Sequence, residues 1–279
     1  MAAAALLTTV AVGWLVRAAA DDTGRRAGGA PPDAVPTAGA AAVSPSPSAA
    51  PEGATLPLSG KTVVIDPGHN PGNFDHPKEI NALVDVGTHR KECDTTGTAT
   101  ADGYTEAEFT LDVSHRLRTL LREQGATVVF THDADRPFGP CIDERARVGN
   151  AARADAVVSV HADGSAAGNR GFHVILPAKV RGGAADTTKI VGPSRTLGEH
   201  IARTFALATG SAPANYIGGG TGLDVRDDLG GLNLSAVPKV FVECGNMRDP
   251  KDAALLKDGS WRQKAARGIA DGISTYLNG

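Results

Sequence analysis

One short stretch, KTVVIDPGHN at residues 61–70, constrains the fold of this chain more than any other. Its β-branched run from Thr62 to Ile65 favours a strand. Pro67 and Gly68 end that strand, because proline cannot donate to a sheet ladder and glycine permits backbone angles that other residues avoid. His69 is therefore presented from a tight turn just past the C-terminal end of a strand, where open α/β sheets build their sites.

Two later stretches repeat this plan. The apolar residues 156–160 run into His161, and residues 240–242 run into Glu243. Because the carboxyl ends of parallel strands meet at one edge of a sheet, three strands are expected to bring two histidines and a carboxylate to the same rim.

Composition narrows the possible partners. The chain has 279 residues, a net charge of −3 and no basic block. Nucleic acid and an anionic membrane surface are therefore not expected partners.

The N-terminal region differs from the rest of the chain. Residues 1–20 are rich in alanine, leucine and valine and end in a small-residue cleavage site, so we expect a signal peptide and export to the periplasm, cell wall or extracellular space. No lysine or arginine precedes the apolar run, which leaves a retained N-terminal anchor open. Residues 21–58 contain mainly alanine, proline, glycine and serine, which predicts a disordered linker.

The remaining residues, 59–279, alternate between strand and helix patterns. We find no internal repeat and no appended binding module. Further strands are expected at residues 126–131 and 171–176, and helices at 105–125, 144–153, 194–209, around 250 and at 260–277, with Asp143 and Ser194 as caps. Residues 71–103, 180–191 and 216–236 are expected to be irregular. This order predicts an α/β fold with a mostly parallel central sheet flanked by helices, in a single domain.

The start of the first helix separates two glutamates. Thr105 and Glu108 fit a capping box, which gives Glu108 a local structural role. Glu106 instead extends the apolar stripe that continues through Phe109 and Val113. A buried carboxylate without a partner is costly, so a cation is expected near Glu106.

His69, Glu106 and His161 together are a residue set that binds catalytic zinc, which takes three protein ligands and leaves one position for water. The residues alone also allow a different interpretation. His69 could bond only to backbone in its turn, His161 could be a satisfied histidine at a sheet edge, and Glu106 could serve only the helix dipole. His76 and His89 lie in the long segment after His69, where histidines that face solvent are more common than ligands.

Glu243 has two possible roles. As a fourth zinc ligand, Glu243 would close the metal site. If one water molecule separates it from the metal, Glu243 would instead be the general base. Its neighbours Val242 and Cys244 suggest a dry environment, which would raise its pKa and suit a proton shuttle.

Four segments in order, VVIDPGHN, GYTEAEFTLDV, VVSVHAD and KVFVECGN, resemble the signatures of zinc-dependent N-acetylmuramoyl-L-alanine amidases. THDADRP and DERARVGNA resemble the segments between these signatures in the same family, and LGGLNLSAVPKVFVECGNMRD resembles the single-domain actinobacterial members. The resemblance implies that His69, Glu106 and His161 bind Zn²⁺ and that Glu243 is the catalytic glutamate. Asn70-Pro71 departs from the glycine found in many relatives, which affects the expected geometry of the first loop.

The implied reaction is hydrolysis of the amide between N-acetylmuramic acid and L-alanine of the stem peptide, with peptidoglycan or a muropeptide as substrate. Alternatives are another zinc peptidase acting on stem peptides, or a catalytically silent protein that binds peptidoglycan or regulates a partner. We expect a monomer. Asp66 could orient His69 or could cap the turn.

The three cysteines contain no C-x-x-C pair, so a thiolate zinc site is not expected. Cys93 and Cys141 lie in predicted loops, and an oxidising compartment favours a disulfide between them. Cys244 is expected to be buried and free.

Overall fold

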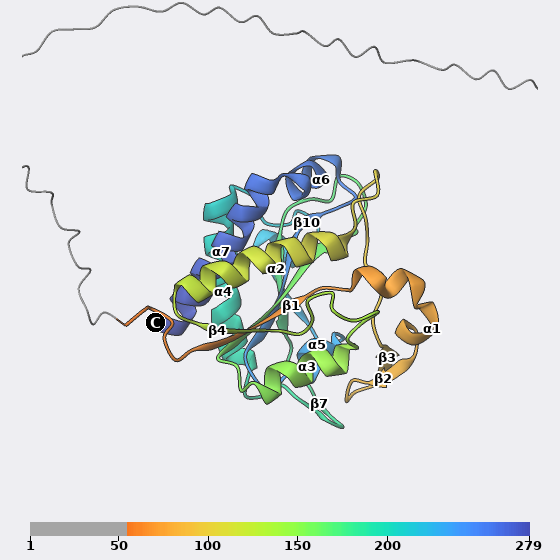
Figure 1. The fold of residues 1–279 in the computed structure, drawn as a ribbon, viewed down its shortest axis with the longest axis vertical. Coiled ribbons are helices and arrows are strands. Elements are labelled where there is room, and N and C mark those ends of the chain that lie inside the picture. Colours follow the sequence, from red (N-terminus) through yellow and green to blue (C-terminus); the bar gives the residue numbers. More distant parts are fainter. Residues whose placement is uncertain (1–54) are drawn as a thin grey trace, which may run out of the picture. The chain divides into compact units, whose positions relative to one another are not determined.

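The computed structural model of this protein describes residues 55–279 (Figure 1). The expected signal peptide or anchor at residues 1–20, and the expected linker as far as residue 54, lie outside the described residues. Leu58, at the end of the expected linker, is fully buried, and its backbone N–H donates to Gln124 O at 2.8 Å. The folded domain therefore starts before residue 59. Between residues 55 and 279, no helix is both long and apolar enough to cross a bilayer.

A six-stranded sheet forms the centre of the domain. In spatial order its strands are β4 (Thr127–Phe130), β1 (Thr62–Pro67), β5 (Ala156–Asp163), β10 (Lys239–Asn246), β6 (His173–Pro177) and β9 (Leu223–Arg226). The first four are parallel, β6 is antiparallel to β10, and β9 is parallel to β6. The predicted α/β fold with a mostly parallel sheet is confirmed.

Helices cover both faces of this sheet (Figure 1). One face packs against α2 (Glu106–Glu123), α4 (Val191–Thr209) and α7 (Gly259–Asn278), and the other faces α3 (Ile142–Ala151) and α5 (Gly230–Asn233). Side chains alternate between the two faces along each strand, so strand periodicity decides which helices each side chain packs against. In β1, Val63 and Ile65 join the large core under α2, whereas Val64 and Asp66 point to the α3 side.

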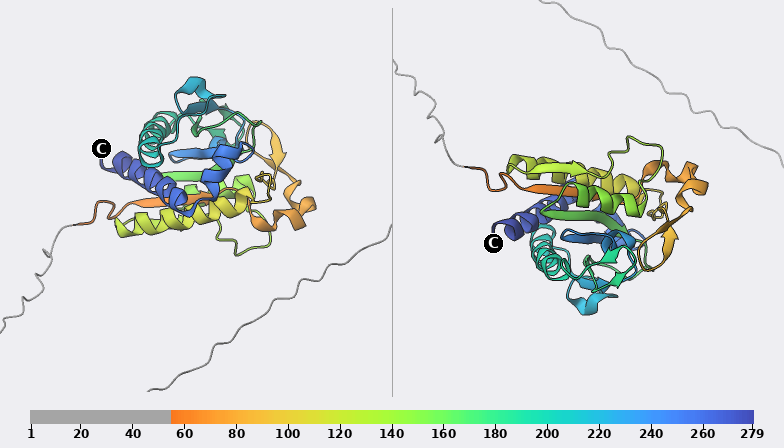
Figure 2. Two further views of the ribbon diagram at one scale, coloured as in Figure 1. Left: turned by 90° about the horizontal axis from the view of Figure 1, so that it is seen from above. Right: turned by 90° about the horizontal axis from the view of Figure 1, so that it is seen from below.

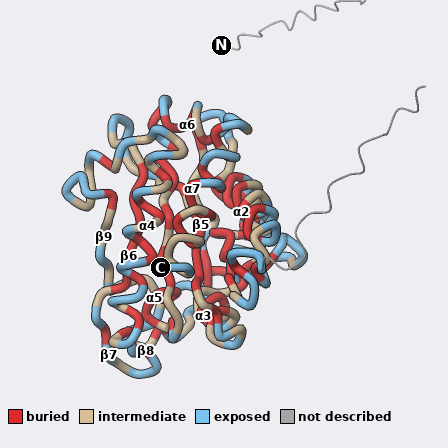
Figure 3. The backbone as a smooth tube through the Cα atoms, turned by 90° about the vertical axis from the view of Figure 1, so that its left-hand side faces the viewer, coloured by how far each residue is buried: buried red, intermediate tan, exposed pale blue. Residues whose placement is uncertain are grey.

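The large core contains the apolar stripe of α2, as the sequence predicts, with Phe109, Val113 and Leu117 fully buried. Figure 3 shows buried residues along the central strands and exposed residues on the outer surfaces of the helices. The α3 side of β5 and β10 carries polar residues instead, including Ser159, His161 and Glu243. That face is therefore available for a site.

The long segment between β1 and α2 is more ordered than an irregular loop. It contains a 3₁₀ helix η1 (Pro71–Asp75), α1 (Pro77–Ile80) and a hairpin of β2 (Leu83–Asp85) and β3 (Arg90–Glu92). This segment lies at the end of the domain away from the C-terminus (Figure 2). A disulfide between Cys93 and Cys141 joins it to the start of α3, as predicted, and Cys244 is buried and free.

Several predicted boundaries are wrong in detail. Cys141 and not Asp143 is the N-cap residue of α3, and α4 begins at Val191, so Ser194 lies inside it. The segments expected to be irregular contain β9, η2 (Gly218–Gly220) and a hairpin of β7 (Arg181–Gly182) and β8 (Ala185–Asp186). The capping box at Thr105 and Glu108 and a short helix around residue 250, α6 (Pro250–Lys257), are as expected, and Asp249 is the N-cap of α6.

Candidate metal centre and catalytic groove

His69 follows β1 in a turn that only a particular sequence allows. Its own φ is +63°, a left-handed conformation that is uncommon for residues other than glycine. A Cβ atom on the preceding Gly68 would lie 2.3 Å from His161 Cε1. Glycine at this position therefore lets the two segments that carry histidines come together.

The structure brings His69, Glu106 and His161 into one cluster. Glu106 Oε1 lies 3.2 Å from His69 Nε2 and 3.0 Å from His161 Nδ1, and one ligand-type atom from each residue lies within 4.8 Å of the others. Glu106 is 5% exposed, whereas Glu108 is exposed and caps the helix. The predicted difference between the two glutamates is therefore confirmed.

The outer nitrogen of each imidazole has its own partner. His69 Nδ1 lies 3.1 Å from the carbonyl oxygen of Thr95, and His161 Nε2 lies 3.1 Å from Ser159 Oγ. Histidines that bind metals usually donate their second ring N–H in this way, which fixes the tautomer and the ring orientation. Two oriented imidazole nitrogens and a buried carboxylate are a donor set that fits zinc.

Charge complementarity holds the cluster together when no cation is bound. Burial lowers the pKa of His69, but the carboxylates of Glu106 and Asp94 outweigh it and raise that pKa to about 10. Burial raises the pKa of Glu106, but His69 and His161 outweigh it and hold that pKa well below its usual range. The cluster thus has the electrostatics of a site made for positive charge.

Glu243 lies beside the cluster but is not part of it. It is the Cα partner of His161 in the parallel β5–β10 pair, and both residues line one groove with His69 and Glu106. Its Oε2 is enclosed and has no hydrogen-bond partner among the described residues. Burial, together with the carboxylates of Glu106 and Asp163, raises the pKa of Glu243 well above its usual value. The raised pKa agrees with the expectation from its apolar neighbours.

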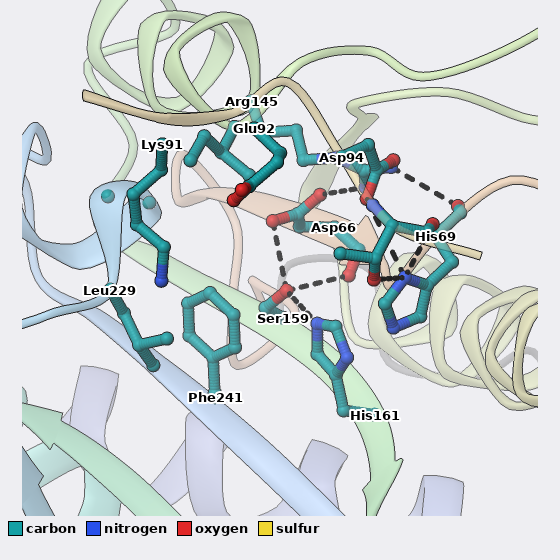
Figure 4. Close-up of a pocket in the computed structure, with 14 residues that line it drawn as sticks. Asp66, His69, Lys91, Glu92, Asp94, Arg145, Ser159, His161, Leu229 and Phe241 are labelled. Atoms are coloured by element: carbon teal, nitrogen blue, oxygen red, sulfur yellow. Dashed lines mark hydrogen bonds and ion pairs between the residues drawn. The ribbon is translucent and has the colours of Figure 1, made fainter. Parts of the chain in front are cut away.

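A cavity of about 170 Å³ adjoins the two histidines on the α3 side of the sheet (Figure 4). Phe241 forms one wall and stacks on the ring of His161, with 5.0 Å between the ring centroids. Leu229 and Ile142 add apolar surface, and Lys91 reaches it from the β2–β3 hairpin. The site therefore combines a polar centre with an apolar wall, as small-ligand sites usually do.

Sequence reasoning missed several neighbours of the cluster. Ser159 and Phe241 stand two residues before His161 and Glu243, so the period of a strand already places them on the same face. Lys239, a lone cation in an apolar strand, signals a buried partner. Arg145 lies within α3, and no local pattern singles it out.

The other residues singled out in the sequence lie outside the cluster of His69, Glu106 and His161. Asp66 does not contact His69. Its carboxylate accepts hydrogen bonds from Thr131, Arg145, Ser159 and Lys239. His76 and His89 lie outside the cluster, and His89 is exposed. Asn70 is buried and caps η1, so the chain after His69 begins with a short 3₁₀ helix.

A family comparison agrees with this geometry. The model of the N-acetylmuramoyl-L-alanine amidase family matches residues 63–275, which is most of the chain, and the protein belongs to that family. It is 40% identical over 221 residues to the N-acetylmuramoyl-L-alanine amidase Rv3717 of Mycobacterium tuberculosis, covering 79% of this chain and 88% of that protein.

Solved structures show the same similarity. The N-acetylmuramyl-L-alanine amidase Ami1 from Mycobacterium smegmatis matches with a TM-score of 0.72 and 41% identity, over 79% of this chain and 98% of that one. The apo form of Ami1 from Mycobacterium abscessus matches with a TM-score of 0.72 and 40% identity, over 79% of this chain and all of that one. The resemblance found in the four sequence segments is therefore confirmed.

Proposed function

We propose that this protein is a zinc-dependent peptidoglycan hydrolase that cleaves the amide bond between N-acetylmuramic acid and L-alanine of the stem peptide. The observation that carries the proposal is the cluster of His69, Glu106 and His161, which lies in one groove with Glu243. Membership of the amidase family supports the reaction, and the donor set supports zinc.

His69 Nε2, His161 Nδ1 and a carboxylate oxygen of Glu106 are the atoms that would hold the metal. When bound there, zinc supplies Lewis-acid chemistry, which polarises the scissile carbonyl and lowers the pKa of water. The outer nitrogens, which meet Thr95 O and Ser159 Oγ, keep both rings aimed at the centre.

Glu243 is proposed to be the general base and then the general acid. It takes a proton from the attacking water and delivers it to the nitrogen of L-alanine as the amide bond breaks. Its enclosed carboxylate oxygen, which no described residue satisfies, can accept that proton. A raised pKa suits both steps, because it makes the carboxylate a stronger base for the water proton and lets the protonated form persist until it donates.

The setting of the reaction follows from the same features. A peptidoglycan substrate lies outside the cytoplasmic membrane, and a disulfide such as Cys93–Cys141 persists in an oxidising compartment. We therefore propose an exported protein that acts on the cell wall or on its soluble muropeptide fragments. We also propose that it acts as a monomer.

Mass spectrometry of purified muropeptides after digestion tests the reaction. We expect two products, a free stem peptide that begins with L-alanine and a glycan with an unmodified lactyl group, and no products after chelation until zinc is restored. Cleavage between two amino acids of the stem would instead favour a zinc peptidase. Binding to peptidoglycan without any cleavage would favour the silent alternative.

A further inference from the structure

Four buried charged side chains lie directly beneath the turn that carries His69. Asp66 and Lys239 are each 1% exposed, and Asp94 and Arg145 are each 6% exposed. Lys239 Nζ lies 3.0 Å from Asp66 Oδ2, and the Arg145 guanidinium pairs with Asp66 and Asp94 at 2.8 Å each. We call Asp66, Asp94, Arg145 and Lys239 the buried charge cluster; it carries two positive and two negative charges. Figure 4 shows Asp66, Asp94 and Arg145 of this cluster.

Arg145 has the most connections in this cluster. Besides its two carboxylate partners, it donates to three backbone carbonyls, those of Pro67 at 2.6 Å, His69 at 3.2 Å and Pro140 at 2.9 Å. Pro67 and His69 flank Gly68. The planar guanidinium therefore clamps both sides of the turn, which a lysine with one terminal nitrogen could not do.

The turn requires such a clamp because His69 has a φ of +63°. A residue with a side chain persists in this conformation only when its surroundings hold it there, and such strain gathers at functional sites. The bond from Arg145 to the carbonyl of His69 acts directly on the strained residue.

The buried charge cluster also reaches both imidazoles. On one side, Asp94 accepts from Arg145 and lies 3.6 Å from His69 Nδ1. Asp94 also accepts from Asn73 Nδ2 and from the backbone N–H of Thr95, whose carbonyl faces the same ring nitrogen of His69. On the other side, Asp66 accepts from Ser159 Oγ at 2.9 Å, and Ser159 meets His161 Nε2. A single guanidinium is thus linked to the outer nitrogens of both histidines.

We propose that Arg145 is a positioning residue for the metal centre, fixing His69 and His161 in the geometry that binds zinc. The inference rests on the proposed function only in taking these two histidines as ligands. Stability alone explains such a cluster poorly, because buried ion pairs are often no more stabilising than apolar residues of similar size. A fixed ligand geometry is a benefit that apolar packing could not supply.

The test uses Arg145→Lys, which keeps the positive charge but removes the fork. Zinc affinity is measured by competition with a chromophoric chelator, and thermal unfolding of the metal-free protein reports stability separately. The cobalt-substituted protein gives a third measurement, because its visible absorption depends on ligand geometry. We expect zinc affinity to fall on the order of 10–100-fold, the usual effect of losing a group that orients a metal ligand, with a changed cobalt spectrum.

Arg262→Lys is the matched control. Arg262 also binds one carboxylate, that of Asp112, and two backbone carbonyls, those of Leu256 and Lys257, but it lies on α7 across the sheet from the buried charge cluster. It should lose stability without losing zinc affinity. If Arg145→Lys and Arg262→Lys both keep wild-type zinc affinity and the wild-type cobalt spectrum, Arg145 has a structural role only and the proposal is wrong.

Two further results keep the outcome clear. If Arg145→Lys does not fold, Asp94→Asn takes its place, because it keeps the shape but removes the charge that Arg145 and His69 share. Zinc affinity at the wild-type level in Asp94→Asn would overturn the proposal. If the wild-type chain itself binds no zinc, the proposed function fails and not merely the role of Arg145.

Discussion

Glu243 lies directly opposite His161 in the parallel pairing of β5 and β10. Residues paired in this way project from the same face of a sheet, so the ladder itself sets the separation between the proposed base and the proposed metal centre. No loop has to close to bring them together. The chemistry of the site therefore depends on strand register, and a slip of one residue would turn Glu243 toward the opposite face.

The first prediction concerns Glu243. Glu243→Gln keeps the size of the side chain but removes the proton acceptor, so turnover of a muropeptide should fall by on the order of 10²–10⁴-fold. Zinc should remain at the wild-type stoichiometry, because the three ligand-type residues are unchanged. Metal analysis and a turnover assay on the same preparation check both points. Loss of zinc would make Glu243 a ligand, and full activity would rule it out as the base.

The second prediction compares two glutamates at the start of α2. Glu106→Ala should abolish retention of zinc, because it removes the carboxylate between the two histidines. Glu108→Ala should keep zinc and cost only the capping box, ~1 kcal/mol of unfolding free energy. Metal content after dialysis and chemical denaturation distinguish the two variants. The opposite pattern would contradict the position of Glu106 in the cluster.

The third prediction concerns protons released when zinc binds. In the metal-free protein at pH 7, His69 carries a proton because its pKa is raised to about 10. Zinc must displace that proton, so affinity should rise by about tenfold per pH unit between pH 7 and 9 through this residue. Calorimetry in buffers of different ionisation enthalpy measures the proton count. A binding enthalpy that does not depend on the buffer would show that His69 is already neutral.

The fourth prediction is loss of stability in acid. Burial raises the pKa values of Asp66 and Asp94, but nearby positive charges outweigh this effect and hold both pKa values well below the usual range. Lys239 and Arg145 lower the pKa of Asp66. Arg145 and His69 lower the pKa of Asp94. Below about pH 4, the ordinary aspartate value, the unfolded chain binds protons that the folded chain does not. The contribution of Asp66 and Asp94 to the unfolding free energy is therefore complete above that pH and is lost as the pH falls further.

Urea unfolding at several pH values between 6 and 2.5 measures this effect. Asp94→Asn cannot titrate at this position, so its stability should fall less steeply in acid than that of the wild type, whatever its stability at pH 6. Equal slopes for the two proteins would show that Asp94 does not contribute.

The fifth prediction concerns the disulfide. Cys93 and Cys141 are 48 residues apart, and closing a loop of that length stabilises by roughly 4 kcal/mol in the chain-entropy model. Replacing both with alanine should lower the unfolding free energy by that order. Cys244→Ala removes the buried free thiol and serves as the control for loss of a cysteine without loss of a cross-link. Equal denaturation midpoints for the double variant and the wild type would contradict the prediction.

The sequence predicts much of the site because the relevant signals are local. The end of β1 at Pro67 and Gly68, the capping box at Thr105 and the apolar stripe of α2 each depend on residues within one or two turns of each other. The capping box and the helix periodicity together separate Glu106 from Glu108. The predicted helix starts at Asp143 and Ser194 are wrong because each rests on residue type alone, in a segment where several residues could begin the helix.

Tertiary structure decided what depends on partners far apart in the chain. Arg145 contacts Asp66 and His69 across more than seventy residues, and Lys239 contacts Asp66 across 173, so no window of sequence contains both members of either pair. The antiparallel position of β6 is of the same kind, since strand direction is fixed by which neighbours pair and not by the residues of the strand. The sequence by itself therefore determined which residue types face the centre. Only packing in three dimensions decided which buried charges hold the site residues in place. The cost of burying a charge is offset by the partner that the fold brings to it.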